Sequence, residues 1–158
     1  MELLQTYYRR QFELIGWWMK RMATQPLSIV ENMTLFWHNH FATSSAKVRS
    51  VPHMAAQNDL FRSESLGSFR KMLHGMAKNV AMLIWLDGNA NRKRQANENF
   101  AREVLELFSL GEGNYSEADI KQAARAFTGW HVRDDKFWFN KRQHDYGSKT
   151  VFGRTGMF

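Results

Sequence analysis

The chain has 158 residues, of which 44% are hydrophobic and 14% aromatic, and 22 Lys and Arg against 15 Asp and Glu give a net charge of +7. This length suits a single domain over residues 1–158 with a substantial core, and the aromatic content excludes a disordered tail. The lack of cysteine excludes a disulfide scaffold, a thiolate zinc finger and a cysteine nucleophile. The longest strongly apolar run, Val80–Leu86, is much shorter than the roughly 20 residues of a membrane span.

Residues 1–128 have the periodicity of helices, and we expect about six of them. The first helix is followed by Thr24 and Pro26, which mark the start of a second helix that runs to about Phe41. The polar stretch Thr43–Asn58 indicates a long irregular connection. The apolar faces expected on the first two helices are Tyr8, Phe12, Ile15, Met19 and Met22, and then Val30, Met33, Phe36 and Trp37.

Four further helices are predicted before residue 128. Asn79 is expected to cap a short helix that reaches Leu86, and Gly111 to end the fifth helix. Ser116 and Asp119 have the spacing of a capping box at the start of the sixth. The apolar faces expected on the third, fifth and sixth helices are Leu66, Phe69, Leu73 and Met76; Phe100, Val104, Leu107 and Phe108; and Ile120, Ala123, Ala124 and Phe127.

At Trp130 the helical period gives way to alternation. Trp130 and Val132, then Phe137 and Phe139, alternate around Asp134-Asp135 and predict a hairpin, and a second turn at residues 145–147 leads into residues 150–152. The predicted fold is mainly α, with about six helices in an orthogonal or bundle-like array followed by a small antiparallel hairpin or three-stranded sheet in residues 130–153. Because the chain stops straight after a strand, we expect it to be a fragment of a longer protein.

Two histidines in the run Phe36–Phe41 are the first candidate for metal binding. On a helix, residues two apart point in directions about 200° apart, so His38 and His40 cannot share an ion. His40 falls beside the apolar face and is expected to be a hydrogen-bonded core histidine. His38 remains free to join a site built from other segments.

A second candidate is the polar strip formed by Asn99, Glu103 and Glu106 along the edge of the fifth helix. Carboxylates beside an apolar face are partly desolvated, which raises their pKa and suits acid–base chemistry or metal binding. The alternative is structural, since the four-residue spacing of Glu98, Arg102 and Glu106 allows pairing across the surface. A di-iron site is rejected, because Glu106 stands where the required histidine would be.

The third candidate is His144-Asp145, which could supply a base or a metal ligand, although Asp145 also occupies a favoured turn position. Phosphate-binding glycine loops, nucleophile elbows and HExxH patterns are absent from the sequence, which excludes the corresponding enzyme classes. The basic residues occur in short, scattered groups, a pattern that favours a solvated surface and makes nucleic-acid binding unlikely.

Five segments of the chain, over about Pro26–Gly153, closely resemble the bacterial family called Domain of Unknown Function 1800. They are ENMTLFWHNHFAT, NDLFRSESLGSFRKML, AMLIWLDGNANRK, NENFAREVLELFSLGEGNYSEADIKQAARAFTGW and HDYGSKTVFG. The sequence departs from the family pattern at Asn79-Val80 and at Arg94. The family's characteristic polar positions fall on His38, Asn39, His40, Asp87, Asn97, Glu98, Asn99, Arg102, Glu103, Glu106, Thr128, His144, Asp145 and Lys149.

The resemblance implies that the chain is the central part of a longer, exported or periplasmic protein. The rest of that protein, a co-encoded secreted protein or an envelope polymer would then be its partners. The family has no established activity, so the resemblance leaves open whether the protein is an enzyme.

Three functional hypotheses follow from these residues. In the leading one, an extracytoplasmic hydrolase-like or metal-binding domain, Glu103, Glu106 and Asn99 are catalytic, and His38, His144 and Asp145 bind a divalent metal. In the alternative, a non-enzymatic binding or structural module of the cell envelope, the polar residues form buried hydrogen-bond networks, and exposed tryptophans contact carbohydrate or anionic polymer. The third is nucleic-acid binding through the basic surface.

Overall fold

The computed structural model describes residues 2–25 and 28–158, and Pro26, predicted at the start of the second helix, lies outside them. The chain divides into two compact units, one running to Ala81 and the other from Met82 to Phe158. This division does not test the single domain expected over residues 1–158, which stays a prediction. None of the described helices is long and apolar enough to cross a membrane.

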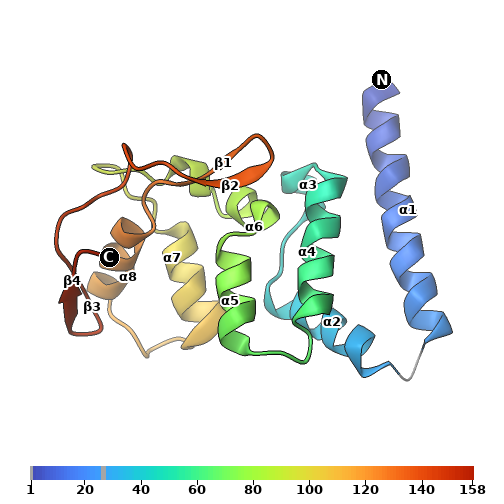
Figure 1. The fold of residues 1–158 in the computed structure, drawn as a ribbon, viewed down its shortest axis with the longest axis horizontal. Helices are drawn as coiled ribbons and strands as arrows, with labels where there is room; N and C mark the ends of the chain where they lie inside the picture. Colours follow the sequence, from blue (N-terminus) through green and yellow to red (C-terminus); the bar gives the residue numbers. More distant parts are fainter. Residues whose placement is uncertain (1, 26–27) are drawn as a thin grey trace. The chain divides into compact units, whose positions relative to one another are not determined.

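The prediction of a mainly α fold with β structure at its end is confirmed, with eight α-helices among the described residues instead of about six (Figure 1). In the first unit these are α1 (Glu2–Thr24), α2 (Ile29–His40), α3 (Ser45–Val48), α4 (Val51–Ser63) and α5 (Phe69–Ala77). Next comes α6 (Val80–Trp85), which begins after Asn79 as expected. The second unit continues with the 3₁₀ turn η1 (Gly88–Ala90), α7 (Asn99–Glu103), the π-helical segment η2 (Val104–Ser109) and α8 (Glu117–Ala126).

The strands form two separate two-stranded antiparallel sheets. The first pairs β1 (Trp130–Arg133) with β2 (Lys136–Phe139), so the hairpin predicted around Asp134-Asp135 is confirmed. The second pairs β3 (Lys149–Val151) with β4 (Arg154–Gly156), and β3 packs on α8 (Figure 1).

The irregular connection predicted for Thr43–Asn58 is wrong, because α3 and most of α4 lie there. Ser44 and Ser50 cap these helices by accepting hydrogen bonds from the backbone N–H groups of Ala46 and His53. The buried face of α4 includes Gln57 and Asn58, so no apolar stripe reveals it in the sequence.

The first unit is organised around a buried carboxylate. Glu31 on α2 is 1% exposed and accepts hydrogen bonds from Arg62 Nε (2.9 Å) and Trp18 Nε1 (3.1 Å), and a third from Arg21. Two arginines and an indole thus compensate the burial of one charge, and they join α1 and α4 to α2. The arginine bonds hold the pKa of Glu31 at about 2.

The apolar faces predicted for the first three helices are partly wrong. The period on α1 correctly predicts a helix, but Tyr8, Phe12, Ile15 and Met19 are all exposed. On α2 the buried residues are Glu31 and Thr34, and Phe36 is half exposed. Leu66 lies before α5 and is exposed, as is Phe69, whereas Met72 and Met76 are buried.

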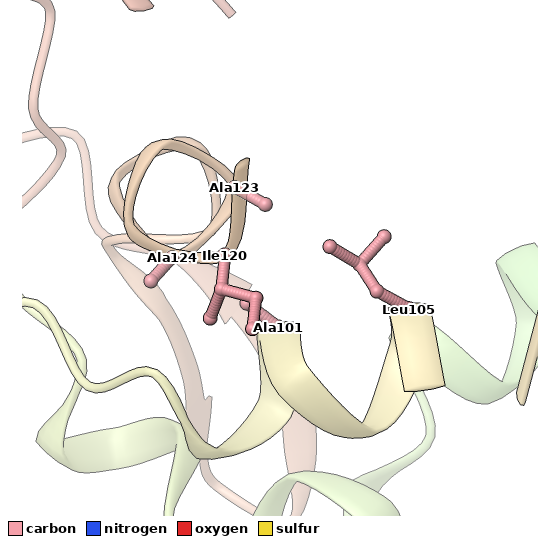
Figure 2. Packing of buried hydrophobic residues seen from close by; sticks show 5 residues of the cluster. All are labelled: Ala101, Leu105, Ile120, Ala123 and Ala124. Carbon is pink, nitrogen blue, oxygen red and sulfur yellow. The ribbon is translucent and has the colours of Figure 1, made fainter. Parts of the chain in front are cut away.

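In the second unit, α7 and η2 pack against α8. Ala101 and Leu105 form a buried cluster with Ile120, Ala123 and Ala124 (Figure 2). The capping box predicted at the start of α8 is present, since Ser116 accepts from the backbone of Asp119 and the Asp119 carboxylate accepts in return. The small side chains of α8 allow a close approach of the two helical segments.

Leu107 was predicted to be buried, and this is wrong: it is 60% exposed, whereas Leu105 and Phe108 are buried. The π-helical segment η2, which carries these leucines, has hydrogen bonds between residues five apart, such as the one from Leu110 N to Leu105 O at 3.0 Å. Each residue of such a wide turn rotates less about the helix axis than in an α-helix, so Leu107 no longer follows Phe100.

Candidate functional site

The predicted site residues are divided between the two units. His38 lies on α2 in the first unit, whereas Asn99, Glu103 and Glu106 lie on α7 and η2 in the second. His144 and Asp145 precede β3, also in the second unit. A pocket that joins His38 to the other five therefore stays a prediction.

Glu103 and Glu106 form a pair of partly buried carboxylates where α7 passes into η2. Burial, followed by the charge of Glu106, raises the pKa of Glu103. The hydroxyl of Tyr115 donates a hydrogen bond of 2.9 Å to Glu106. The π-helical segment that follows Glu103 and carries Glu106 is a departure from regular helix that occurs frequently at functional sites.

Arg102 forms one of the two surface ion pairs, with Glu98 and Glu106, that the sequence spacing allowed. Its guanidinium is 3.3 Å from Glu98, and it binds both carboxylate oxygens of Glu117 on α8 at 2.9 Å each. Glu106 accepts from Tyr115 instead of completing the surface pairing with Arg102. The surface-pairing interpretation therefore holds for Glu98 and Arg102, whereas a catalytic role for Glu103 and Glu106 stays a prediction.

His144 is buried in a hydrogen-bond network at the end of α8. Its Nδ1 is 2.8 Å from the backbone oxygen of Thr128, and its Nε2 is 3.2 Å from that of Phe158. The Thr128 hydroxyl accepts from the backbone N–H of Asp145 at 2.8 Å. A metal ion at either ring nitrogen would have to displace one of these carbonyl contacts.

Asp145 and Lys149 belong to the same network. Asp145 pairs with Arg125 on α8 (2.7 Å) and accepts from the backbone N–H of Gly147 (2.8 Å), which is the turn geometry predicted for it. Arg125 accordingly lowers the pKa of Asp145. Lys149 is 1% exposed, and its ammonium group donates to backbone oxygens of Asp145, Gly147 and Phe158. These contacts fix the loop before β3 on α8.

The part of the chain that the structure describes holds no group of three or more His, Asp or Glu side chains placed to bind a metal ion. His40, expected in the core, is partly buried against Phe36, Trp37 and Phe69. His38 lines a small cavity of the first unit with Asn58.

A groove of about 660 Å³ lies along the β1–β2 hairpin and is lined by Arg133, Trp138 and residues 139–143. Trp138 is 38% exposed, and the guanidinium carbon of Arg133 is 5.1 Å from the centre of its ring. On the other face of the hairpin the half-buried Trp130 lies edge-on to Phe137 at 5.3 Å. The hairpin thus presents to solvent an aromatic ring and, beside it, an arginine whose Nε lies 3.5 Å from the Asp134 carboxylate.

Sequence reasoning missed several residues that organise these sites. Arg125, Tyr115, Arg62 and Asn58 each act through a partner far along the chain, and nothing in local periodicity marks such pairs. Glu31 was also missed, because an acid in the first turn of a helix is usually a solvated group that complements the helix dipole.

The family model described as "Protein of unknown function (DUF1800)" matches residues 2–158. No curated protein matches the chain, and no solved structure matches it.

Proposed function

The chain belongs to the DUF1800 family of proteins of unknown function, and we propose that it is a binding module for an anionic polysaccharide, bound in the groove beside Trp138. The observation that carries this proposal is the pairing of the exposed Trp138 ring with Arg133 along that groove. An anionic polymer of the cell envelope is the partner we expect.

The groove supplies the two contacts that an acidic sugar requires. A pyranose ring has an apolar face of C–H groups that packs on an exposed indole, and its carboxylate pairs with a guanidinium. Between Arg133 and Gln143 four cationic side chains stand against two acidic ones. The excess positive charge favours an anionic polymer over a neutral one.

Trp138 is a single exposed ring on this hairpin, flanked by amide side chains at Asn140 and Gln143. Single-stranded nucleic acid is bound by successive aromatic platforms along a basic channel. One ring with amides, which donate to and accept from hydroxyl groups, suits a sugar better.

The proposal is tested by titrating the protein with polygalacturonate, neutral dextran and oligo(dT), following tryptophan fluorescence. We expect saturable binding of polygalacturonate, no binding of dextran, and weaker binding of oligo(dT). Loss of the ring in Trp138→Ala should weaken polygalacturonate binding by about tenfold, the equivalent of about 1.4 kcal/mol. Tighter binding of oligo(dT) with a steep salt dependence would establish the nucleic-acid alternative instead.

The two carboxylates at the junction of α7 and η2 favour a second function, acid–base hydrolysis by Glu103 and Glu106. Burial and the neighbouring Glu106 raise the pKa of Glu103, which suits it to donate a proton to a leaving group. Glu106, held by the Tyr115 hydroxyl, would act as the base that activates water.

This second function is tested by measuring reducing ends released from polygalacturonate. Slow release by the wild type, abolished in Glu103→Gln and retained in Glu112→Gln, would support it. Glu112 is the matched control, because it is an exposed carboxylate close to the same Tyr115. Equal release by all three proteins would reject the assignment.

A further inference from the structure

Helix α1 carries an apolar stripe that no described element of the first unit covers. The helix lies at the edge of that unit, beside α2 and α4 (Figure 1). None of its described residues is buried. Residues three and four apart share one side of a helix, and on one side of α1 such residues are apolar and exposed over about 22 Å, namely Leu4, Tyr8, Phe12, Ile15 and Met19.

The side of α1 that contacts the rest of the first unit is a different one. Tyr7 donates a hydrogen bond of 2.8 Å to the backbone oxygen of Ser45 on α3, and Trp18 donates one of 3.1 Å to Glu31 on α2. These bonds lie near the two ends of the helix and fix its rotation. The apolar stripe therefore faces solvent because of how α1 is held, and not because the helix is loose.

A groove of about 670 Å³ lies along the N-terminal half of the stripe, between α1 and α3. Leu3, Leu4 and Tyr8 line it on α1, and Arg49, which follows α3, lines it from the other side. Arg49 is exposed. An exposed guanidinium beside an apolar groove can pair with a phosphate while a hydrocarbon chain lies against the apolar wall.

The charge of the first unit is complementary to an anionic surface. Residues 1–81 contain ten Lys and Arg against five Asp and Glu, so this unit carries +5 of the net +7. Arg9 and Lys20, with Glu13 between them, are exposed on the side of α1 next to the stripe, away from α3 and Arg49. Cations therefore flank the stripe on both sides.

The combination of charge and apolar surface selects the partner. A second copy of the chain could cover the stripe, but it would bring the same positive unit against it. A purely polar anion would neutralise the cations and leave the stripe in water. A bilayer that contains anionic lipids satisfies both, because phosphates lie directly beside hydrocarbon.

We propose that α1 is an interfacial helix that binds the protein to an anionic lipid membrane. The apolar stripe lies at the boundary between headgroups and acyl chains, and Arg9, Lys20 and Arg49 pair with lipid phosphates. A helix with aromatic and aliphatic residues on one side and cations beside them binds in this way without crossing the bilayer. The surface belongs to the first unit and is independent of the polysaccharide groove in the second.

The test is co-sedimentation of the whole chain with two kinds of vesicle, one of phosphatidylcholine alone and one in which a third of the lipid is phosphatidylglycerol. We expect at least about tenfold tighter binding to the anionic vesicles, weakened by salt, and a monomer in analytical ultracentrifugation without lipid. Absence of binding to the anionic vesicles overturns the proposal. A dimer that Phe12→Ser dissociates also overturns it, since the stripe would then bind a second copy.

Two pairs of variants locate the contact. Phe12→Ser removes a ring that is 71% exposed and should weaken binding to anionic vesicles about tenfold, whereas Leu66→Ser, at a side chain 61% exposed outside α1, should not. Arg49→Gln should weaken it about fivefold, and Lys71→Gln, at an exposed position of α5, should change it little. Equal effects within either pair would overturn the assignment to this surface. Polygalacturonate binding should be unchanged in Phe12→Ser.

Discussion

Arg133 and Trp138 lie on opposite strands of the β1–β2 hairpin, with the guanidinium carbon 5.1 Å from the ring centroid. Trp138 pairs directly with His131, so Arg133 is its diagonal neighbour on the same face. The opposite face carries Trp130 and Phe137 in mutual contact. Strand alternation therefore places the cation and the exposed ring on one face, beside the buried His131, and the half-buried Trp130 and Phe137 on the other.

Glu31 should make the stability of the protein depend on acid pH. Its pKa is about 2, below the ordinary value of 4.5, so its contribution is complete above about pH 4.5 and is lost as the pH falls toward 2. The difference corresponds to about 3 kcal/mol. Glu31→Gln leaves two arginines facing a neutral group. We therefore expect the free energy of unfolding, measured with urea at pH 7, to fall by about 3–5 kcal/mol.

The diagnostic quantity is the difference in unfolding free energy between the wild type and Glu31→Gln, which should shrink between pH 5 and pH 2. Glu13→Gln is the control, since Glu13 is exposed and its nitrogen–oxygen distance to Arg9 is 3.8 Å. A difference that stays constant with pH would show that the Glu31 carboxylate is not held in its charged form.

Gly129 should tolerate no side chain. Its φ is +81°, and an added Cβ would lie 2.6 Å from the backbone oxygen of Asn140 and 3.2 Å from the nitrogen of His144. Gly113 has a nearly equal φ of +84° and open space around it. Gly113→Ala should cost about 1–2 kcal/mol for its backbone conformation alone, and Gly129→Ala at least about 2 kcal/mol more.

Thermal unfolding of the two glycine variants measures this difference directly. Because the φ penalty is common to both, the excess in Gly129→Ala reports the approach of the residue 140–144 loop to Gly129. Equal losses would mean that this loop lies further from Gly129 than the structure places it.

Because of the wide turn of η2, we expect truncation of two leucines only two positions apart to cost very different amounts of stability. Leu105 is buried and Leu107 is 60% exposed. Leu105→Ala should therefore cost about 2–5 kcal/mol, whereas Leu107→Ala should cost less than about 1 kcal/mol. Chemical denaturation of both variants decides between this turn and a regular α-helix, for which Leu107 would be the costly position.

The elements predicted correctly from the sequence depend on neighbouring residues. The capping box of α8 needs only Ser116 and Asp119, and the hairpin needs the alternation on either side of Asp134-Asp135. The helix α4 was missed because Gln57 and Asn58, which are polar, occupy buried positions on it. Periodicity detects burial only where the buried side chains are apolar.

The sequence was enough to predict some residues of the candidate site, but not the contacts that they make. Asp145 was correctly predicted as a turn residue, since its bond to Gly147 is local. Its ion pair with Arg125 and the bond between Glu106 and Tyr115 join different segments, and tertiary packing alone creates them. The groove beside Trp138 arises in the same way, from a strand and the loop that follows it.

The most direct test of polysaccharide binding compares Trp138→Ala with Trp17→Ala in one titration against polygalacturonate at fixed ionic strength. Trp17 is the matched control, because it is 46% exposed and has the guanidinium of Arg62 5.1 Å from its ring, yet lies in the other unit. We predict about a tenfold loss of affinity in Trp138→Ala and no change in Trp17→Ala. Equal affinities in the two variants would contradict the assignment of the groove.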